Sequence, residues 1–424
     1  MAKVIPFNRA QALAYPFALK HPYSILALDP RLGKSRIAIE LREKLGGNCL
    51  IVAPSQLVLN WKKEIIKWAG DSVQITTILK GKDIYEICDT DYAIISFDLA
   101  KKAENFFDWA DMIVIDEGHN LKSMEAQRTQ FMHRCIYEYS IPRMHILTGT
   151  PIKNRVKEFY SLLALTNYNP SAADSQFLDR YPSEIDFADQ FSHRRKYQIE
   201  INEKLVTILN WTGIKNIPEL KQHLKGKYIR IKAEEGDLPP VSYKSILISE
   251  TPDKKLLAEF DAHFEGEDAG SVKSQYKKEA ALKKVPFTIR YVEGLLEEIK
   301  SCLIYSDHVV SAEAIAQHFG TKALTGKVPA KVRSQLADKF QAGDGRVLVA
   351  TIGALKEGRD LFRANDIVLN DYSWIPGDLK QVINRIRSIG KKTPCLVHEI
   401  YGSPQDEYIC DTLKSKIETI EQAT

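Results

Sequence analysis

Two series of short apolar runs limit the folds open to this chain more than any other feature. Unbroken apolar runs of this length are typical of strands buried on both faces of a parallel sheet. The first series lies at Ser24–Leu28, Cys49–Ala53, Tyr92–Ser96, Met112–Ile115 and Met144–Leu147, and the second at Leu303–Tyr305, Val347–Ala350, Ile367–Leu369 and Leu396–Ile400.

Helical patterns separate these runs. In Leu57–Trp68, for example, Leu57, Trp61, Ile65 and Trp68 recur at helical spacing. Strands that alternate with helices imply a parallel sheet with both faces covered. The chain has 424 residues, which is enough for two or three domains. We therefore predict an α/β fold with two similar lobes, at 1–165 and 236–424, separated by a different middle segment.

The middle segment, 166–235, is predicted to be helical, basic and aromatic, and to end in an extended linker at Asp237–Pro240. Residues 186–230 hold nine Lys or Arg against five Asp or Glu, although the whole chain carries only +4. Such a segment can meet a phosphate backbone, or it can be a solvated helix face. Its aromatic residues either wedge into a DNA junction or form local core: Phe177, Tyr181, Phe187 and Phe191.

The cysteines and the apolar runs exclude several classes of protein. The six cysteines are scattered without a C-x-x-C pair, which fits reduced thiols and argues against a disulfide framework or a zinc site. The first residues lack a secretory apolar core, and no run approaches the roughly 18 residues that a membrane span needs. We expect a cytoplasmic protein with no membrane partner.

The run Met112–Ile115 leads directly into Asp116 and Glu117. Open α/β sheets bind ligands beyond the carboxyl ends of their strands, and a buried carboxylate pair is costly without a cation or donors. Asp116 could therefore hold Mg²⁺, and Glu117 could orient or deprotonate a water aimed at a nucleotide phosphate. The alternative is a strand that ends in a solvated, helix-capping Asp-Glu pair.

A second motif, ILALDPRLGKS, occupies Ile25–Ser35. An apolar strand enters a turn, and Gly33, Lys34 and Ser35 open a helix whose N–H groups, ammonium and hydroxyl suit phosphates and Mg²⁺. Leu28 stands where the pattern G-x-x-x-x-G-K-[ST] has its first glycine. Upstream, Gln11 either contacts adenine or is a plain polar helix residue. The candidate phosphate-loop residues are Asp29, Pro30, Arg31, Leu32, Gly33, Lys34, Ser35 and Arg36.

A third motif, Thr148–Pro151, follows another predicted strand. Small residues at a strand end let a phosphate chain or a second backbone pass close by, and Pro151 turns the chain out before the next helix. Thr148 and Gly149 could couple the nucleotide site to a second ligand. The alternative is an ordinary turn.

In this order, the phosphate-loop, DEGH and LTGTP boxes resemble those of superfamily-two helicases. More narrowly, three segments of the chain resemble the Swi/Snf-type double-stranded DNA translocases: IVAPSQLVLNWKKE, DEGHNLKS and LTGTPIKNRVKEFYSLL. Their later boxes resemble LIYSDHV, LTGK, VLVATIGALKEGRDL and DYSWIPGDLKQVINRIRSIGKK. Within that family, three features resemble the annealing-helicase, fork-remodelling branch most: GIKNIPELKQHL, the Leu-Pro-Pro linker and the W-x-P-G-x-x-x-Q pattern. The compact length suggests a bacterial or phage form.

This resemblance implies two RecA-like lobes and an ATP and Mg²⁺ site. It implies Lys34 and Ser35 on the phosphates and metal, Asp116 on the metal, and Glu117 as catalytic base. Gln11 would contact adenine, His119 would couple hydrolysis to DNA, and Gly358 would lie in a box that faces nucleotide and DNA. Arg385 and a second arginine would stabilise charge on the transferring phosphoryl group.

The chain departs from the family pattern at two places. The family box Q-x-x-x-R-x-x-R-x-G has serine at its second arginine position here, Ser388. Arg387 is the candidate replacement, although on a regular helix it points about 100° away from Ser388. Arg31 replaces a glycine of the family's phosphate loop.

The expected function is an ATP-driven motor on duplex DNA that remodels branched DNA by fork regression, branch migration or annealing. The alternatives are a strand-separating DNA or RNA helicase and a non-catalytic DNA-binding scaffold. We expect a monomer in a bacterial or phage-infected cell, with recombination or replication proteins as partners. The candidate DNA contacts are Ser55, Gln56, Ser96, Lys122, Thr150, Asn154, Arg194, Arg195, Lys196, Ser306, Thr325 and Thr351.

Overall fold

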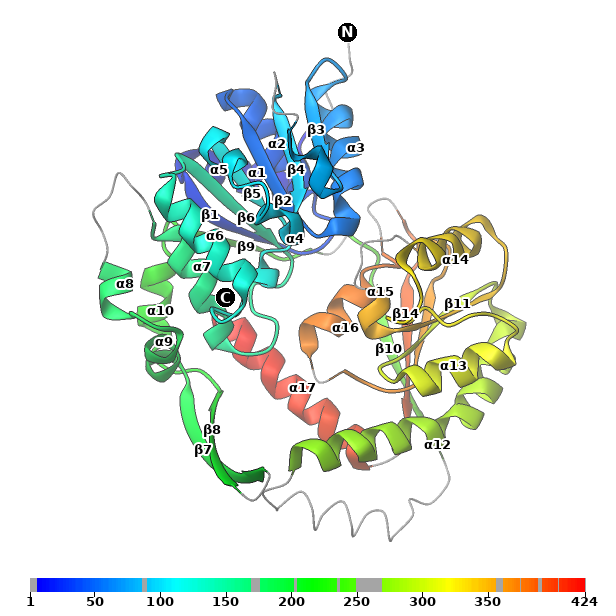
Figure 1. Cartoon of the computed structure of the whole chain (residues 1–424). Helices are drawn as coiled ribbons and strands as arrows, with labels where there is room; N and C mark the ends of the chain where they lie inside the picture. Colours follow the sequence, from blue (N-terminus) through cyan, green and yellow to red (C-terminus); the bar gives the residue numbers. More distant parts are fainter. Residues whose placement is uncertain are drawn as a thin grey trace. The chain divides into compact units, whose positions relative to one another are not determined.

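The computed structural model describes residues 6–85, 90–168, 176–201, 204–234, 237–248, 269–355, 361–373, 375–387, 391–402 and 404–423. The chain divides into two compact units, which are described separately. The first comprises Met1–Arg194, Trp211–Ala233 and Thr419–Thr424, and the second comprises Arg195–Asn210 and Glu234–Glu418. Each unit contains one parallel sheet with helices packed against it (Figure 1), so the predicted α/β fold is confirmed.

The first sheet has the strand order β3-β4-β2-β5-β6-β1-β9, and every neighbouring pair is parallel. Three strands have the bounds that the apolar runs predicted, and two more extend the predicted run at one or both ends. Strands β3 and β9 were not predicted. The strands are β1 (Tyr23–Leu28), β2 (Cys49–Ala53), β3 (Ile75–Ile78), β4 (Tyr92–Ser96), β5 (Met112–Ile115), β6 (Arg143–Thr148) and β9 (Tyr228–Ile231).

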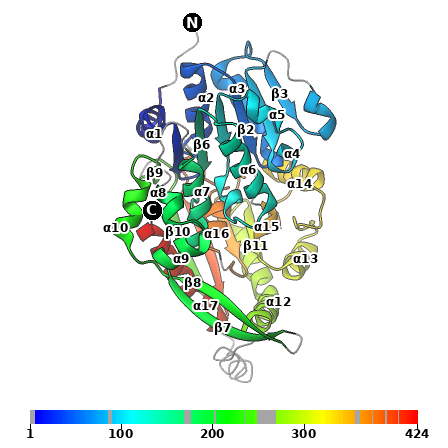
Figure 2. The same cartoon turned by 60° about the vertical axis from the view of Figure 1, so that its left-hand side comes forward.

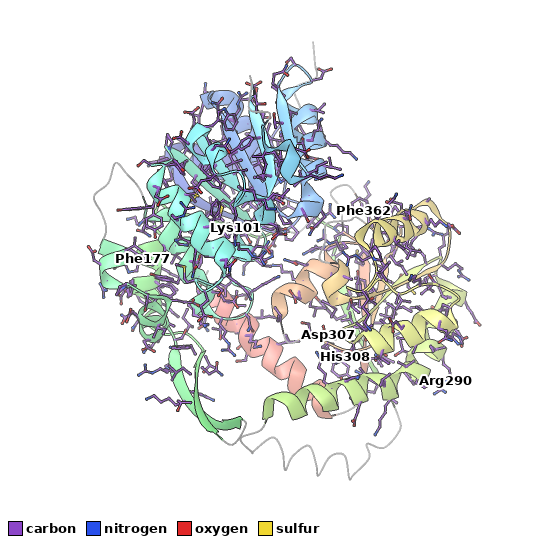
Figure 3. All side chains as sticks on the ribbon, in the orientation of Figure 1. Lys101, Phe177, Arg290, Asp307, His308 and Phe362 are labelled. Atoms are coloured by element: carbon purple, nitrogen blue, oxygen red, sulfur yellow. The ribbon has the colours of Figure 1, made fainter. Side chains whose placement is uncertain are left out.

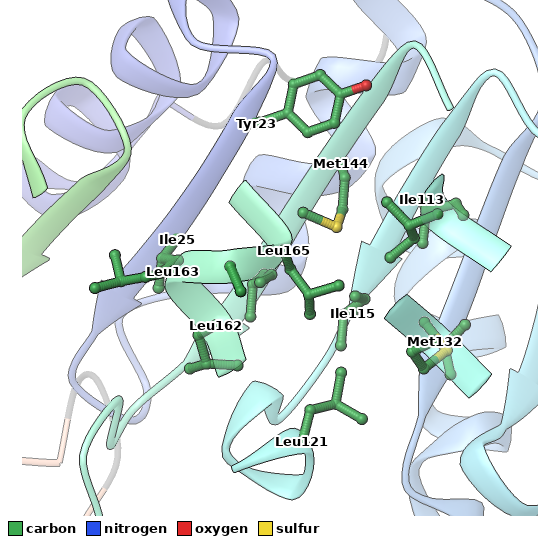
Figure 4. Packing of buried hydrophobic residues seen from close by; sticks show 14 of the residues in the cluster. Tyr23, Ile25, Ile113, Ile115, Leu121, Met132, Met144, Leu162, Leu163 and Leu165 are labelled. Carbon is green, nitrogen blue, oxygen red and sulfur yellow. The ribbon is translucent and has the colours of Figure 1, made fainter. Parts of the chain in front are cut away.

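Alternate strand residues enter two hydrophobic cores, one on each face of the first sheet. On one face, Leu26 and Ile51 pack with residues of α1, α2 and α3. On the other face, Ile25 and Ile113 pack with residues of α5, α6 and α7, as Figure 4 shows around Leu163. Burial on both faces explains why these strands are apolar throughout. The helices named here are α1 (Arg9–Lys20), α2 (Lys34–Leu45), α3 (Val58–Ala69), α5 (Asn105–Trp109), α6 (Gln127–Glu138) and α7 (Phe159–Thr166).

Short helices and turns complete the first unit and the middle segment. The 3₁₀ turns are η1 (Ser55–Leu57), η2 (Gly81–Tyr85), η3 (Gly118–Leu121) and η4 (Val156–Glu158). The remaining helices are α4 (Phe97–Ala100), α8 (Gln176–Arg180), α9 (Glu184–Phe191) and α10 (Ile217–Leu224).

The prediction of a helical middle segment is wrong for two stretches. Residues His193–Ile201 and Lys204–Thr212 form the two-stranded sheet β7-β8. Strand β9 pairs with β1, so residues well beyond 165 complete the first sheet. The prediction depended on continuous apolar runs. Strand β9 is short and contains a charged residue, and β7 and β8 mix polar and apolar residues, so none of the three shows such a run.

The aromatic residues of the middle segment form local core, so the DNA-wedge interpretation is wrong. Phe177, Tyr181, Phe187 and Phe191 are at most 3% exposed. Their rings pack against one another and against His223, and Phe177 lies on α8 (Figure 3). Aromatic rings that are already buried against one another have no free face to offer a base.

The second sheet has the order β10-β14-β13-β11-β12, again entirely parallel. The four predicted strands are present, and the exposed edge strand β10 was not predicted. The strands are β10 (Val241–Leu247), β11 (Cys302–Ser306), β12 (Val347–Thr351), β13 (Asp366–Leu369) and β14 (Cys395–Tyr401). The helices are α12 (Ala269–Glu298), α13 (Val309–His318), α14 (Ala330–Ala342), α15 (Ile352–Leu355), α16 (Pro376–Ile383) and α17 (Pro404–Ala423).

Within the described ranges, no helix has both the length and the apolar character needed to span a membrane.

Candidate functional site

The three predicted nucleotide motifs follow adjacent strands of the first sheet. Strand β6 lies between β5 and β1, and all three run in the same direction. The phosphate loop after β1, the acidic pair after β5 and the Thr-Gly-Thr turn after β6 therefore lie at one edge of the sheet. This edge is where an open α/β sheet binds its ligand.

The phosphate loop is shaped by backbone conformations that glycine favours. Gly33 has φ +81° immediately before α2, and a Cβ there would lie 2.1 Å from Nε2 of Gln11. The same Nε2 donates to the carbonyl of Gly33 at 3.2 Å, while the Asn8 N–H donates to Oε1 of Gln11 at 3.1 Å. Gln11 thus contacts the phosphate loop directly. Its predicted contact with adenine stays a prediction.

Arg31 also has a left-handed backbone, with φ +73°. Arg31 replaces a glycine of the family pattern, yet the loop keeps the left-handed backbone that glycine favours. A residue with a side chain is strained in that conformation. The departure therefore changes the side chain of the loop but not its left-handed turn.

Lys34 lies at the first position of α2. Its ammonium donates to the carbonyl of Leu28 at 3.0 Å. Burial lowers the pKa of Lys34, and the carboxylates of Glu117, Asp116 and Asp29 oppose that shift. The ammonium of Lys34 thus interacts electrostatically with the acidic pair, an arrangement that suits a phosphate ligand.

Asp29 is turned toward β9. Arg230 Nη2 donates to Asp29 Oδ1 at 2.6 Å, and the Ala233 N–H donates to Oδ2 at 3.0 Å. Both side chains are about one-tenth exposed, at 12% for Asp29 and 11% for Arg230. Asp29 therefore fixes the loop to β9. Leu32, in the same loop, is buried in the hydrophobic core and so anchors the loop to it.

Arg36, a predicted phosphate-loop residue, is held by other groups. Its guanidinium lies over the rings of Trp68 and Phe7, at 4.0 and 4.7 Å from the ring centroids. It also pairs with Glu40 at 3.2 Å and donates to the carbonyl of Pro6 at 3.0 Å. These contacts tie the start of α2 to α3 and to the segment before α1.

Asp116 is 8% exposed, and both carboxylate oxygens accept hydrogen bonds. The indole N–H of Trp61 donates to Oδ2 at 2.8 Å, and the Glu117 N–H donates to Oδ1 at 2.9 Å. Burial, together with the Glu117 carboxylate, raises the pKa of Asp116 to about 6 despite the opposing effects of Trp61 and Lys34. The buried carboxylate pair therefore favours a bound cation.

Glu117 has a left-handed backbone, with φ +50°. The following residue, Gly118, packs so closely on β6 that a Cβ would lie 2.2 Å from Cγ2 of Ile146. Glu117 Oε2 lies 3.2 Å from Nδ1 of His119, which is buried. The strained backbone aims Glu117 toward His119, the residue that the resemblance assigns to coupling.

The residues present fit Mg²⁺, which prefers oxygen ligands. Asp116 offers a carboxylate that its own burial destabilises, and Ser35 offers a hydroxyl at the start of α2. Among the described residues, no group of three or more His, Cys, Asp or Glu side chains could hold a metal ion. A metal held by few protein ligands and by nucleotide phosphates is the usual arrangement for Mg²⁺.

The Thr-Gly-Thr turn is compact and buried. The Thr150 N–H donates to Oγ1 of Thr148 at 3.1 Å, and a Cβ on Gly149 would lie 3.1 Å from two ring carbons of Pro30. The turn thus packs directly on the phosphate loop. Its position between β5 and β1 suits the coupling role predicted for Thr148 and Gly149.

Six predicted DNA contacts of the first unit lie at or after the carboxyl ends of β2, β4, β5 and β6. Ser55 and Gln56 are exposed on η1, whereas Ser96 is buried and caps α4 by accepting from the Leu99 N–H at 3.4 Å. Oδ1 of Asn154 is buried without a hydrogen-bond partner. Lys122 Nζ lies 3.1 Å from Glu158 Oε1. Ser96 and Thr150 therefore have structural roles in addition to the predicted one.

Three predicted DNA contacts of the second unit, Ser306, Thr325 and Thr351, lie at the carboxyl edge of its parallel sheet. Ser306 at the end of β11 pairs in register with Thr351 at the end of β12. The Thr351 N–H donates to the carbonyl of Leu324 at 2.9 Å, which places Thr325 beside them. Oγ1 of Thr325 is buried without a partner. The structure thus brings all three hydroxyls of this unit together.

The two candidate arginines differ in their surroundings. Arg387 Nε donates to the carbonyl of Pro239 at 2.9 Å, and Nη1 donates to Oδ1 of Asn384 at 3.1 Å. The backbone carbonyl of Arg385 accepts from the Leu361 N–H at 2.9 Å. Arg387 therefore holds the predicted linker. Gly358, Ser388 and Gly390 lie outside the described residues.

Sequence reasoning missed three residues that shape this site: Trp61, Glu158 and Arg230. Glu158 is 7% exposed and accepts from the N–H groups of Lys153 and Asn154 at 3.1 and 3.0 Å. A signal for Trp61 was present, since it is an aromatic residue on the apolar face of a predicted helix. No local sequence pattern distinguishes the largely buried charges Arg230 and Glu158 from charged residues that lie at the surface.

Comparisons with known proteins agree with the site. Residues 17–235 match the SNF2-related domain, and residues 283–390 match the helicase conserved C-terminal domain. The chain is 24% identical to the DNA annealing helicase and endonuclease ZRANB3 of Mus musculus, over 95% of the chain and 39% of that protein.

Two further relatives are similar at the same level. The SWI/SNF-related matrix-associated actin-dependent regulator of chromatin subfamily A-like protein 1 of Xenopus laevis is 26% identical over 94% of the chain and 42% of that protein. The DNA repair and recombination protein RAD54 of Saccharomyces cerevisiae is 23% identical over 89% of the chain and 50% of that protein. The chain thus spans half or less of the length of these relatives.

Among solved structures, the Sulfolobus solfataricus SWI2/SNF2 ATPase core in complex with dsDNA aligns with a TM-score of 0.45 and 19% identity, over 99% of this chain and 94% of that one.

Proposed function

Because the chain belongs to the SNF2-related family of superfamily-two helicases, we propose that it is an ATP-driven motor that moves along double-stranded DNA. The observation that carries the proposal is that the loop with Lys34 and the pair Asp116–Glu117 follow β1 and β5, which flank β6 and run parallel to it. A cation beside a buried acid pair, at the carboxyl edge of a parallel sheet, suits a nucleoside triphosphate.

In this proposal each group has a role in hydrolysis. The N–H groups at the start of α2 and the Lys34 ammonium bind the phosphates. Mg²⁺, when bound, neutralises charge on the phosphate oxygens, and Ser35 and Asp116 would hold it. Glu117 orients the attacking water and accepts its proton. The contact between Glu117 and His119 offers a route by which the acid responds to DNA.

The DNA partner is proposed from the polar residues that follow the strands of both sheets. Hydroxyl and amide groups at such positions suit contacts to phosphates, which are largely independent of sequence. Movement along DNA then requires that ATP binding and hydrolysis change how these contacts are held. A motor of this kind needs no base-specific contact.

The branched-DNA activity is the finer part of the proposal. It is supported by the similarity to a relative named as a DNA annealing helicase and to another named for DNA repair and recombination. The Leu-Pro-Pro linker and the segment GIKNIPELKQHL support the same branch. We propose fork regression, branch migration or annealing as the resulting activity.

The decisive experiment measures phosphate release from ATP in the presence of single-stranded, duplex, forked or four-way DNA, and of duplex RNA. We expect stimulation by duplex DNA and the largest stimulation by forked or four-way DNA. Stimulation only by single strands or RNA would favour a strand-separating helicase. Binding of DNA without any phosphate release would favour a non-catalytic scaffold.

A further inference from the structure

The β7-β8 hairpin displays basic side chains to solvent. His193, Arg194, Arg195 and Lys196 are all exposed at the start of β7. Arg194 lies 2.9 Å from the Asp189 carboxylate, an ion pair that leaves its side chain 44% exposed. The adjacent Arg195 and Lys196 add two more positive charges.

The root of the hairpin is fixed to the first unit. Trp211 on β8 is 6% exposed, and its indole N–H donates to Asp189 Oδ1 at 2.7 Å. The same carboxylate binds Arg194 of β7, so one residue of α9 ties both strands. The ammonium of Lys157 lies 5.3 Å from the Trp211 ring centroid. A two-stranded hairpin is marginally stable alone, which makes this root necessary.

The dimensions of the hairpin suit an extended polyanion. Strand β7 begins shortly after α9 in the chain, and Figure 2 shows β7 and β8 side by side as one long ribbon. Each strand has nine residues, which corresponds to roughly 30 Å. Successive side chains point to opposite faces, so Arg195 presents its charge on one face and Arg194 and Lys196 on the other.

The location of the root favours duplex DNA over other polyanions. Lys157 belongs to η4, which begins two residues after Asn154, a candidate DNA contact. The root residues Arg194 and Trp211 therefore lie beside the carboxyl edge of the first sheet, near other candidate DNA contacts of this unit, whereas Arg195–Asn210 belong to the second unit. Duplex DNA carries one charge per about 1.7 Å of axis, so it offers phosphates along the whole length of the ribbon.

We propose that the β7-β8 hairpin is an arm that binds the phosphate backbone of duplex DNA through Arg195 and Lys196, while Arg194 holds the root. The inference rests on the proposed function for the identity of the partner. It adds a binding element outside the helicase motifs. Because the contact is made to phosphates, it raises affinity without selecting a sequence.

The test measures the affinity of the full chain for a linear duplex by fluorescence anisotropy, between about 50 and 200 mM salt. The variant Arg195→Gln/Lys196→Gln removes two charges and keeps polar side chains of similar length. We expect the slope of log K against log salt to become shallower by about 2, and the affinity at 0.1 M salt to fall by about tenfold or more. Unchanged slope and affinity would overturn the proposal.

Lys20→Gln/Lys44→Gln is the matched control. Both lysines are exposed and lie in the last turns of α1 and α2, at the opposite edge of the first sheet. This control should leave the slope unchanged. An equal loss in the control would overturn the proposal, because it would show only the effect of net charge.

A second variant tests the proposal independently, in case Arg195→Gln/Lys196→Gln does not fold. Thr207→Glu places a negative charge at an exposed position of β8, and Thr207→Gln is its neutral counterpart. We expect the glutamate alone to weaken duplex binding by several-fold, with thermal unfolding unchanged in both. Equal affinities would count against the arm.

The two proposals can fail separately. If duplex DNA stimulates the wild-type ATPase but the hairpin variants bind DNA normally, the arm is wrong and the motor stands. If the hairpin variants lose DNA affinity but no DNA stimulates wild-type ATP hydrolysis, the arm stands and the motor is wrong.

Discussion

The guanidinium of Arg230 lies 2.6 Å from Oδ1 of Asp29, 201 residues earlier in the chain. Arg230 also donates to the carbonyl of Ala27 at 2.9 Å, and the nearby Ala233 N–H donates to the other Asp29 oxygen. The strand that follows the middle segment therefore holds the phosphate loop in place. The sequence motifs alone place Asp29 in the loop but give it no partner.

We predict that Arg230→Ala destabilises the first unit and weakens ATP binding. The substitution leaves a carboxylate that is 12% exposed without its cation, which typically costs about 3–5 kcal/mol. Urea unfolding and titration with a fluorescent ATP analogue measure the two effects. Arg230→Lys, which keeps the charge but not the fork of donors, should lose less. Wild-type stability and ATP affinity in Arg230→Ala would show that the ion pair does not support the loop.

We predict that Lys34→Ala and Glu117→Gln both abolish DNA-stimulated ATP hydrolysis, but for different reasons. Loss of the ammonium removes a phosphate-binding charge, so ATP affinity falls as well. Loss of the Glu117 carboxylate removes the base, which lowers turnover by about 10²-fold or more and leaves ATP binding intact. Phosphate release and nucleotide titration separate the two. Wild-type turnover in either variant would refute the assignment of this site.

We predict that Arg385→Ala and Arg387→Ala differ. The resemblance assigns Arg385 to the charge that develops on the transferring phosphoryl group, and such arginines contribute about 10³–10⁵-fold to turnover. Arg387 donates to Pro239 and Asn384, so its loss should lower the stability of the second unit instead. Steady-state turnover and thermal unfolding measure the two effects. A collapse of turnover in Arg387→Ala without loss of stability would make Arg387 the replacement for the missing arginine at Ser388.

The strands that the sequence predicted best are those buried on both faces. Strands β2, β4 and β5 have the bounds that their apolar runs indicate, because every side chain in them is buried. Strands β9 and β10 lie at sheet edges, where Tyr228, Arg230 and Tyr243 retain exposure. An edge strand does not need a continuous apolar run, so its pairing could not be inferred from composition.

The β7-β8 hairpin was detectable in principle. Tyr197, Ile199 and Ile201 alternate with polar residues, and Val206, Thr207 and Ile208 form a β-branched run. Both patterns are typical of strands. Long-range partners such as Arg230 for Asp29 carry no local pattern at all, because only the folded sheet brings β9 to β1.

We predict a pH-dependent stability difference between Asp371→Asn and the wild type. Asp371 follows β13, is 2% exposed, and accepts from the N–H of Asp307, which lies next to His308 after β11 (Figure 3). Burial raises the pKa of Asp371 to about 6, although Lys284, the Asp307 N–H, Ser306 and Lys277 oppose the shift. The folded state therefore holds this proton more tightly than the unfolded state, whose value is 3.8.

The sign of the effect follows from that difference. The stabilisation from the bound proton is fully present below about pH 4 and is lost as the pH rises through about 6. Asparagine has no charged form, so Asp371→Asn should match the wild type at pH 4 and exceed it by up to about 3 kcal/mol above pH 6. Urea unfolding at several pH values measures this. A constant difference across the range would mean that Asp371 does not titrate as described.

The last prediction concerns the link between the two loops that follow β5 and β6. Lys122 Nζ lies 3.1 Å from Glu158 Oε1, and Glu158 Oε2 accepts from the N–H groups of Lys153 and Asn154. Lys122 follows the acidic pair, whereas Lys153 and Asn154 follow the Thr-Gly-Thr turn. One buried carboxylate therefore connects the loop that carries Glu117 to a loop with candidate DNA contacts.

We predict that this carboxylate transmits DNA binding to ATP hydrolysis. Glu158→Gln can still accept from a backbone N–H, but it loses the charge that binds Lys122. Lys122→Met and Glu158→Gln should each lower the ratio of DNA-stimulated to basal turnover by several-fold, with ATP affinity unchanged. The double variant should show no further loss, because both substitutions remove the same contact. Additive losses would mean that the two residues act independently, and an unchanged ratio would mean that the loops are coupled by another route.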